Sequence, residues 1–408
     1  MRITSSHRIG DGAVLSISIM RRAGAVAAHP VAAQSPSKTA SKRARSGLKS
    51  YALVCALMTL LGVGVVWNGN KAYGPEMYAD TGMVKAAEAF SNGRNYAVFD
   101  LNLNIRALRD AQVARFTETP DLVLLGASHW QEAHASLVPH VKMYNAHIHR
   151  DYWEDPLGMV DIFVRHGRLP KKMIISIRDN QFVPVASRKD YLWEPGIAAY
   201  RAMADRLGLE KQPLTDTLPY QRVKQLFSIS MLRDNFTRWQ KAEEKPHATT
   251  GTHFKALDVL LPDGSITWSD EHMKVFTPER TKAESVSFAA AKSGKAPEID
   301  PRGVEAFDRL LTFLKKQGVT VYLAHPPFNP QFYDQVQGTP YMAGLKAIEQ
   351  LTEKFASDHG LKIIGGFNPH KLGCTAAMFI DAEHSDGRCL KSVFDQFSVY
   401  DRAAGPTT

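Results

Sequence analysis

Short runs of consecutive apolar residues alternate along this chain with segments in which apolar residues recur at helical spacing. The runs cover residues 121–125, 173–177, 319–324 and 361–364, and the helical patterns cover residues 157–164, 304–314 and 345–355. Short apolar runs are typical of strands buried on both faces, and their alternation with helices indicates parallel pairing. The pattern therefore predicts an α/β fold with three layers, α/β/α, in which helices cover both faces of a parallel sheet.

This rhythm is interrupted between about residues 184 and 300. Helical patterns at 200–207 and 226–239 are followed by the turn Pro262-Asp263-Gly264, which is typical of a hairpin, and then by Lys- and Ala-rich sequence without strong periodicity. We predict an insertion over the carboxyl ends of the strands, where ligands of open α/β sheets bind. Before the fold, residues 68–117 read as a lead-in with a helix at 83–90 and a strand at 96–99.

Residues 51–67 contain no charged side chain, and this length is at the short end of what spans a bilayer. Tyr51 and Trp67 stand at its two ends, where amphipathic rings favour the membrane interface. No small-x-small cleavage site follows Trp67, so an uncleaved signal anchor is favoured over a cleaved signal peptide. The basic residues on its amino side predict that residues from about 68 onward are exported.

Most of the positive charge lies in one tail. The chain has a formal net charge of +9, and residues 1–50 contain nine Lys or Arg and one acid, which leaves +1 for all later residues. A tail rich in Ala, Ser, Lys and Arg predicts a disordered cytoplasmic segment. The basic balance therefore gives no support for a nucleic-acid partner, because it lies behind a membrane helix.

Two distant segments contain the groups of a nucleophilic site. Ser128 follows an apolar run at the small-residue turn Gly126-Ala127-Ser128, and Asp381 precedes His384 by three residues. A serine becomes a nucleophile when a base removes its proton, and a carboxylate orients that base. The spacing of three allows both Asp381 and His384 to project from one side of a turn. The alternative for this pair is a solvated turn with a helix-capping Asp.

These segments resemble the first and last conserved blocks of the SGNH/GDSL hydrolase superfamily. Ser128 corresponds to the first block, and Asp381-Ala382-Glu383-His384 is similar to the closing Asp-x-x-His block. The resemblance extends to an exported, membrane-anchored bacterial branch related to proteins of polysaccharide O-acetylation. It covers about residues 118–183 and 302–396, and its further segments are residues 143–145, 153–166, 169–177, Phe182 and 324–327.

The resemblance implies an SGNH-like domain over residues 118–400, with Ser128 as nucleophile, His384 as base and Asp381 as the group that orients it. The superfamily also implies a glycine amide in its second block and an asparagine in its third, both donating to an oxyanion. Residues 145–150 of this chain contain no glycine. The Ser128 amide, Asn180 and Asn145 remain the oxyanion candidates.

Cys374 and Cys389 flank the Asp381–His384 segment, and Cys55 lies in the apolar segment. In an oxidising exported compartment Cys374 and Cys389 are a disulfide candidate, the alternative being two free buried thiols. His147, His149 and Asp151 are residue types that bind metals, but no further ligand follows nearby. We expect neither a metal nor another cofactor.

Together these features predict a single-pass protein of the bacterial inner membrane with its catalytic domain in the periplasm. The expected activity is that of a serine esterase or O-acyltransferase on ester groups, acetyl above all, of a cell-surface or exported polysaccharide. The expected partners are an acyl ester or acylated glycan, the inner membrane and a membrane acyl-donor protein. The missing second-block glycine leaves an alternative: a catalytically degenerate SGNH-fold protein that binds glycan or scaffolds an export complex.

Overall fold

The computed structural model describes residues 38–73, 80–98, 104–149, 151–184, 196–210, 226–241 and 246–403. The chain divides into two units, residues 1–61 and residues 62–408, each considered by itself. The second unit contains two sheets and the candidate site.

The larger sheet has five strands, and every pairing within it is parallel. Its order is β3-β2-β4-β8-β9, and the strands are β2 (Leu122–Leu125), β3 (Met143–Asn145), β4 (Lys172–Ser176), β8 (Thr320–His325) and β9 (Lys362–Gly365). The predicted parallel sheet is confirmed. Because all strands run the same way, the segments that follow β2 and β4 leave the sheet at one edge.

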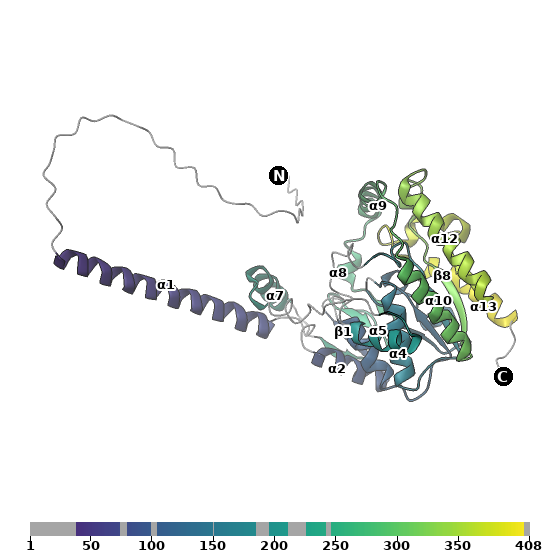
Figure 1. The fold of residues 1–408 in the computed structure, drawn as a ribbon, viewed down its shortest axis with the longest axis horizontal. Coiled ribbons are helices and arrows are strands. Elements are labelled where there is room, and N and C mark those ends of the chain that lie inside the picture. The colour runs from purple at the N-terminus through teal and green to yellow at the C-terminus, as the bar shows by residue number, and fades with distance from the viewer. Residues whose placement is uncertain are drawn as a thin grey trace. The chain divides into compact units, whose positions relative to one another are not determined.

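Helices cover both faces of this sheet (Figure 1). Val123 and Ile175 belong to the core under one set of helices, whereas Leu124 and Ile174 belong to the core on the opposite face. The first face is covered by α4 (Glu154–Arg165), α5 (Ile197–Leu207), α10 (Pro301–Lys316) and α12 (Pro340–His359), and the second by α13 (Gly387–Ala403). This three-layer arrangement explains why the strands read as continuous apolar runs.

The smaller sheet has the order β5-β1-β6-β7 and is antiparallel. Its strands are β1 (Asn95–Val98), β5 (His247–Thr249), β6 (Asp258–Leu260) and β7 (Ile266–Thr267). The expected hairpin at residues 262–264 joins β6 to β7, and the expected early helix and strand are α2 (Asp80–Ser91) and β1. Because β1 lies between two strands of the insertion, the lead-in and the insertion fold together.

The remaining described helices are α3 (Ile105–Val113), α7 (Ile229–Lys241), α8 (Asp270–Met273), α9 (Pro278–Lys292) and α11 (Pro330–Tyr333), with 3-10 turns at Ser128–Trp130, Ala135–Leu137, Pro369–Leu372 and Ala376–Met378. Helix α9 occupies the sequence for which no periodicity was evident. Its start is set by Thr277, whose side chain accepts the Arg280 amide, and by Pro278 in the first turn. That capping signal, and not an apolar stripe, marks this helix.

Helix α1 (Lys38–Tyr73) contains one segment, Lys49–Asn70, that is long and apolar enough to cross a membrane, with a mean hydropathy of 2.0. The most apolar 18-residue stretch of that segment has no buried residue. The helix begins at Lys38, so the prediction of disorder through residue 50 is wrong from residue 38 onward. The rest of that tail, residues 1–37, lies outside the described residues.

Candidate active site

Ser128 stands immediately beyond the carboxyl end of β2, as the first residue of the 3-10 turn Ser128–Trp130. The turn needs a glycine at position 126, because a Cβ atom there would lie 2.6 Å from Trp130 and 2.8 Å from the Ser176 side chain. The buried Trp130 indole donates to the Ser176 hydroxyl at the end of β4, with a distance of 2.7 Å. This packing fixes where the chain leaves β2 and therefore where Ser128 stands.

Asp381 shapes the loop that contains His384. One carboxylate oxygen, Oδ1, accepts the backbone amides of Glu383 and His384, each at 2.8 Å. The other, Oδ2, lies 2.7 Å from Nδ1 of His384. Both oxygens therefore accept hydrogen bonds from the same short turn, and these bonds hold the side chain of His384 in one orientation.

The structure brings Ser128, His384 and Asp381 together. Nε2 of His384 lies 2.8 Å from the Ser128 hydroxyl, while Nδ1 of the same ring faces Asp381. A Ser–His–Asp chain of this kind is recognised by its geometry and not by sequence position. Because Asp381 accepts from Nδ1–H, the neutral ring has Nε2 free to accept the serine proton.

Charge around His384 favours its protonated form. Burial disfavours the imidazolium, but the carboxylates of Asp381, Glu383 and Glu132 outweigh burial and raise the pKa of His384 to about 9. Burial likewise opposes ionisation of Asp381, yet the His384 charge and hydrogen bonds, with two backbone amides, bring the pKa of Asp381 below its ordinary value. The pair is therefore an imidazolium and a carboxylate at neutral pH.

Glu132 is a further acid near this histidine. Burial raises the pKa of Glu132 to about 7, against the effect of the hydrogen bond that Trp268 donates to it. Since the negative charge of Glu132 also raises the pKa of His384, the two titrations are linked.

His129 follows the nucleophile and lies beside the triad. Its ring centroid is 5.5 Å from that of His384, and its Nε2 atom is 3.8 Å from a Glu383 oxygen. Burial lowers the pKa of His129, helped by the positive charges of His384 and Arg178 and opposed by Glu383. The His129 ring is therefore neutral and adds no positive charge next to the imidazolium of His384.

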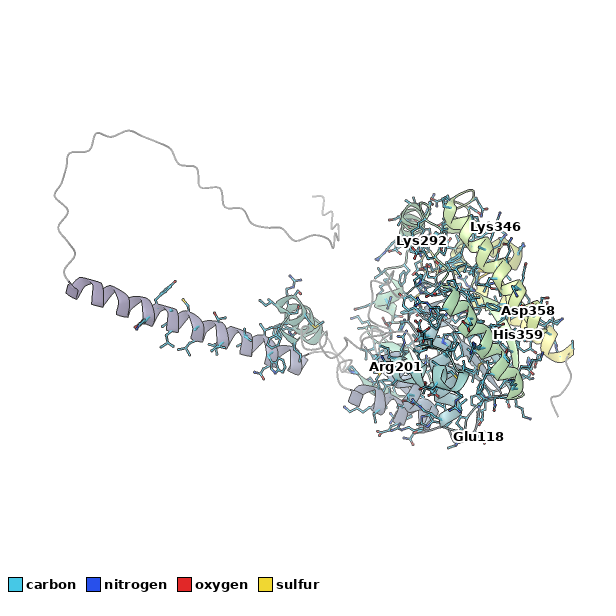
Figure 2. All side chains as sticks on the ribbon, in the orientation of Figure 1. Glu118, Arg201, Lys292, Lys346, Asp358 and His359 are labelled. Carbon is cyan, nitrogen blue, oxygen red and sulfur yellow. A yellow bond between two sulfur atoms is a disulfide. The ribbon has the colours of Figure 1, made fainter. Side chains whose placement is uncertain are left out.

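A buried ionic network follows β4. The Arg178 side chain lies 3.1 Å from an Asp151 oxygen, and the Asp179 carboxylate accepts from Lys292 and Tyr341 at 3.1 and 2.7 Å. Lys292 extends from α9 (Figure 2), so this network ties the insertion to the sheet. Burial opposes the Asp179 charge, but Lys292 and Arg178 outweigh it and lower its pKa to about 2.

The oxyanion candidates have different surroundings. The prediction of Asn145 as an oxyanion donor is wrong. Its side-chain amide already donates to the carbonyls of Trp130 and Ala133, at 2.6 and 3.1 Å, and an amide has only two hydrogens to donate. The Asn180 amide donates to Asp179 at 2.7 Å, which leaves its second hydrogen available. The Ser128 amide begins a helical turn, where amides have no intrahelical acceptor. The Ser128 amide and the Asn180 side chain therefore remain the predicted oxyanion donors.

The two cysteines flanking the Asp381–His384 loop, Cys374 and Cys389, are joined by a disulfide. The segment from Phe379 to Ser385 is closed further by a β-bridge between these two residues. The disulfide and the bridge restrict the loop on both sides of the acid and the base.

His147 and His149 lie edge to face with ring centroids 5.9 Å apart, and Asp151 pairs with Arg178 instead of approaching them as a third ligand. Within the described residues, no group of three or more His, Cys, Asp or Glu side chains is arranged to hold a metal ion.

A hollow of about 380 Å³ opens next to the acid and base loop. It is lined by α9 and by this loop, through Glu284, Ser287, Phe288, Ala291, Asp381, Ala382 and Glu383. Its lining contains one aromatic ring, Phe288, and three acidic residues.

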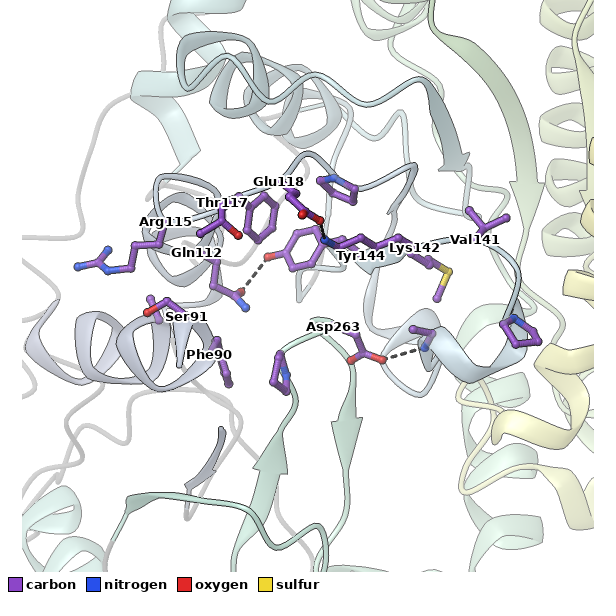
Figure 3. A pocket seen from close by; sticks show the side chains of 17 residues that line it. Phe90, Ser91, Gln112, Arg115, Thr117, Glu118, Val141, Lys142, Tyr144 and Asp263 are labelled. Atoms are coloured by element: carbon purple, nitrogen blue, oxygen red, sulfur yellow. Dashed lines mark hydrogen bonds and ion pairs between the residues drawn. The ribbon is translucent and has the colours of Figure 1, made fainter. Parts of the chain in front are cut away.

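A separate hollow of about 470 Å³ lies between α2, α3 and the start of β3 (Figure 3). It contains none of the triad residues. Glu118 and Lys142 pair across its lining at 2.6 Å, and Tyr144 donates to Gln112 at 2.8 Å. It is therefore distinct from the groove next to Asp381.

Several residues near the triad were not expected from the sequence, among them Glu132, His129 and Arg178. The available signal was their place in the chain, because His129 follows the nucleophile and Arg178 comes directly after a predicted strand.

Comparison with protein-family models gave no match for this chain, and comparison with curated proteins gave none either.

Proposed function

We propose that this protein is a serine enzyme that cleaves or transfers an acyl group through an acyl-Ser128 intermediate. The observation that carries the proposal is the continuous chain of contacts from Ser128 through His384 to Asp381, at 2.8 and 2.7 Å. Each atom has the partner that its role requires: the nucleophile faces the base, and the base faces the acid.

The chemistry proceeds in two steps. In the first, Ser128 Oγ attacks the ester carbon while His384 Nε2 takes its proton, and the departing alcohol then receives that proton. In the second step, His384 removes a proton from water or from an acceptor hydroxyl, which attacks the acyl-serine and releases Ser128. Water as acceptor gives an esterase, and a sugar hydroxyl gives an O-acyltransferase.

The proposed cellular location and substrates follow from the resemblance to the SGNH superfamily and its exported branch. We propose a bacterial inner-membrane protein held by α1, with a cytoplasmic amino terminus and a periplasmic catalytic domain. The apolar segment Lys49–Asn70 supports an anchor, and the disulfide supports an oxidising compartment. The proposed substrates are acetyl or other acyl esters of a cell-surface or exported polysaccharide.

A degenerate binding or scaffold protein is the alternative. It is favoured by the absence of a glycine in the second block and by the engagement of Asn145 in structural hydrogen bonds. A protein without catalysis has no need to keep Ser128 within hydrogen-bonding distance of His384. The intact contact therefore favours the enzyme.

The test uses the full chain in detergent with an activated acetyl ester, with and without an oligosaccharide acceptor. Wild type should release the chromogenic alcohol, and Ser128→Ala should reduce turnover to background. Ser136→Ala, an exposed serine in the neighbouring turn, is the matched control and should retain wild-type turnover. Unchanged turnover in Ser128→Ala would end the proposal, and acetyl transfer to the oligosaccharide would identify a transferase.

A further inference from the structure

Three large apolar side chains at and just before helix α7 are exposed. Phe227, Ile229 and Phe236 are 45%, 73% and 38% exposed, and Ile229 is the most exposed large apolar side chain among the described residues outside α1. Single apolar residues on a protein surface are common, but several on one short element indicate a surface that contacts something other than water.

The sequence of α7 (Ile229–Lys241) has the pattern of an amphipathic helix. Apolar residues recur at positions 229, 232, 236 and 239, a spacing that places them in one stripe along a helix. The helix also contains three basic residues, Arg233, Arg238 and Lys241, and one acid. An apolar stripe combined with a surplus of basic residues is typical of helices that lie in the surface of a membrane.

The start of α7 is bound to the end of the apolar segment of α1. The buried Asn70 side-chain amide donates to the backbone carbonyls of Leu226 and Ser228, at 3.0 and 2.9 Å. Between these two carbonyls, the Phe227 ring contacts the Trp67 ring, with centroids 4.9 Å apart. Polar and aromatic contacts thus attach the same short segment to α1.

A close approach of α7 itself to α1 adds to these contacts. Leu232, a member of the apolar stripe, packs directly on Gly69, where a Cβ atom would overlap its side chain. The stripe therefore begins against the last turn of the apolar segment Lys49–Asn70. Ile229 and Phe236, three and four residues to either side of Leu232, continue the apolar surface away from this contact.

The place of these contacts along α1 sets the level of α7 relative to a bilayer. Lys49–Asn70 has 22 residues, which extend for about 33 Å as an α-helix and match the roughly 30 Å of bilayer hydrocarbon. Residues 67–70 then stand where hydrocarbon gives way to headgroups, a level at which tryptophan such as Trp67 is enriched. A helix attached to these residues meets the headgroup layer.

We propose that α7 is an interfacial helix whose apolar stripe lies at the boundary between lipid headgroups and acyl chains. This inference rests on the proposed membrane anchor and adds a second contact with the same bilayer. Lipid then shields Phe227, Ile229 and Phe236 from water, and the net positive charge of the helix favours anionic headgroups.

A second copy of this chain or another protein is the competing occupant of the stripe. Whatever covers Ile229 must also adjoin the end of the apolar segment, because Phe227 and Leu232 contact Trp67 and Gly69 there. A bilayer that holds the apolar segment meets this condition without any further partner. The continuity of the two apolar surfaces therefore favours lipid.

The test measures the depth of a fluorophore in the full chain, reconstituted in vesicles of phosphatidylcholine and phosphatidylglycerol. Cys55→Ala removes the free cysteine, and the other two cysteines are held in the disulfide. A nitrobenzoxadiazole label is then attached through Ile229→Cys, on the stripe. Ser230→Cys, at the next exposed position of the same helix but off the stripe, is the matched control.

The label at position 229 should emit at shorter wavelength than the label at position 230. A nitroxide placed near the lipid headgroup should quench it more strongly than a nitroxide near the end of the acyl chain, because the stripe enters only the boundary region. The label at position 230 should be quenched less by both. Thermal unfolding reports whether each labelled protein is folded, and if Ile229→Cys is not, Phe236→Cys gives the same measurement from the stripe.

A third label, attached through Leu60→Cys in the middle of the apolar segment, separates this inference from the anchor. It should be quenched most by the nitroxide near the chain end. If it is, water-like emission at position 229 would overturn the interfacial helix and leave the anchor in place. Emission at short wavelength from position 229 without quenching by either lipid would assign the stripe to a protein partner and also overturn the inference. A label at position 60 that both nitroxides fail to quench would instead remove the anchor.

Discussion

Ser128 Oγ and His384 Nε2 lie 2.8 Å apart although 256 positions separate the two residues in the chain. The contact depends on the sheet and on the loop before α13: the serine follows the carboxyl end of β2, and the histidine lies in that loop. The contact thus joins the two ends of the α/β domain.

The first prediction concerns pH. His384 accepts the serine proton only as the neutral ring, and its pKa is raised to about 9 by nearby carboxylates. Because the neutral fraction grows as pH rises, kcat/KM should increase from pH 7 toward pH 9 and above. At pH 7 the protonated ring of His384 therefore predominates. A pH–rate profile of the full chain measures this limb, and a midpoint at or below 6.5 would contradict it.

Glu383→Gln tests the cause of that shift. The Glu383 carboxylate raises the pKa of His384, so its neutralisation should move the acidic limb of the profile to lower pH and raise activity at pH 7. Glu284→Gln changes an acid that lines the same groove and pairs with Arg280 on α9. The limb should stay in place in this control. Equal shifts of the acidic limb in both variants would contradict a specific effect of Glu383 on the pKa of His384.

The second prediction concerns the Asp179 network. Asp179 is completely buried and accepts from Lys292 and Tyr341, so Asp179→Asn leaves the Lys292 ammonium without its carboxylate partner. The free energy of unfolding should fall by about 3–5 kcal/mol at pH 7. Chemical denaturation of the detergent-solubilised chain measures this loss.

The same carboxylate has a defined pH signature. Its pKa is lowered to about 2, so its stabilisation is complete above the unfolded value of about 4 and is lost as pH falls toward 2. The gap between wild type and Asp179→Asn should therefore narrow in strong acid. Asp334→Asn, which changes an exposed acid paired with His370, should cost much less at every pH. A constant gap between pH 7 and pH 2 would contradict this origin.

The third prediction concerns the disulfide between Cys374 and Cys389, which closes a loop with a sequence separation of 15. Closing a loop of this length stabilises a protein by about 3 kcal/mol in the chain-entropy description. Reduction should lower the temperature of unfolding and reduce activity, because the loop contains Asp381 and His384. The doubly substituted Cys374→Ala, Cys389→Ala protein should show both losses already and no response to reductant. Full activity in the reduced protein would show that the loop holds its shape alone.

Much of the fold could be predicted from the sequence, because its strands are buried on both faces. Residues 173–177 and 319–324 read as apolar runs and form β4 and β8 nearly to the residue. Ser128 and His384 could be paired because an apolar run ends at a small-residue turn and an Asp-x-x-His block follows far along the chain. Both features are local, so they are visible without the structure.

Other features depend on contacts between distant segments and could not be read in this way. Strand β1 is completed only by β5 and β6 from the insertion, and α9 has a weak apolar face although Thr277 and Pro278 mark its start. From the sequence, the Asn145 side chain was a candidate oxyanion donor. In the structure its amide donates to backbone carbonyls in the turn after Ser128. Helical propensity through the Ala- and Lys-containing segment extends α1 back to Lys38, where composition alone suggested disorder.

The acyl-serine intermediate is tested most directly by mass spectrometry of the full chain, quenched in acid during turnover of an activated acetyl ester. The account predicts a mass increase of one acetyl group that maps to the peptide containing Ser128, is absent from Ser128→Ala, and accumulates when an acceptor is withheld. An intact protein that turns over the ester with no adduct on Ser128, or with the adduct at another residue, would contradict it.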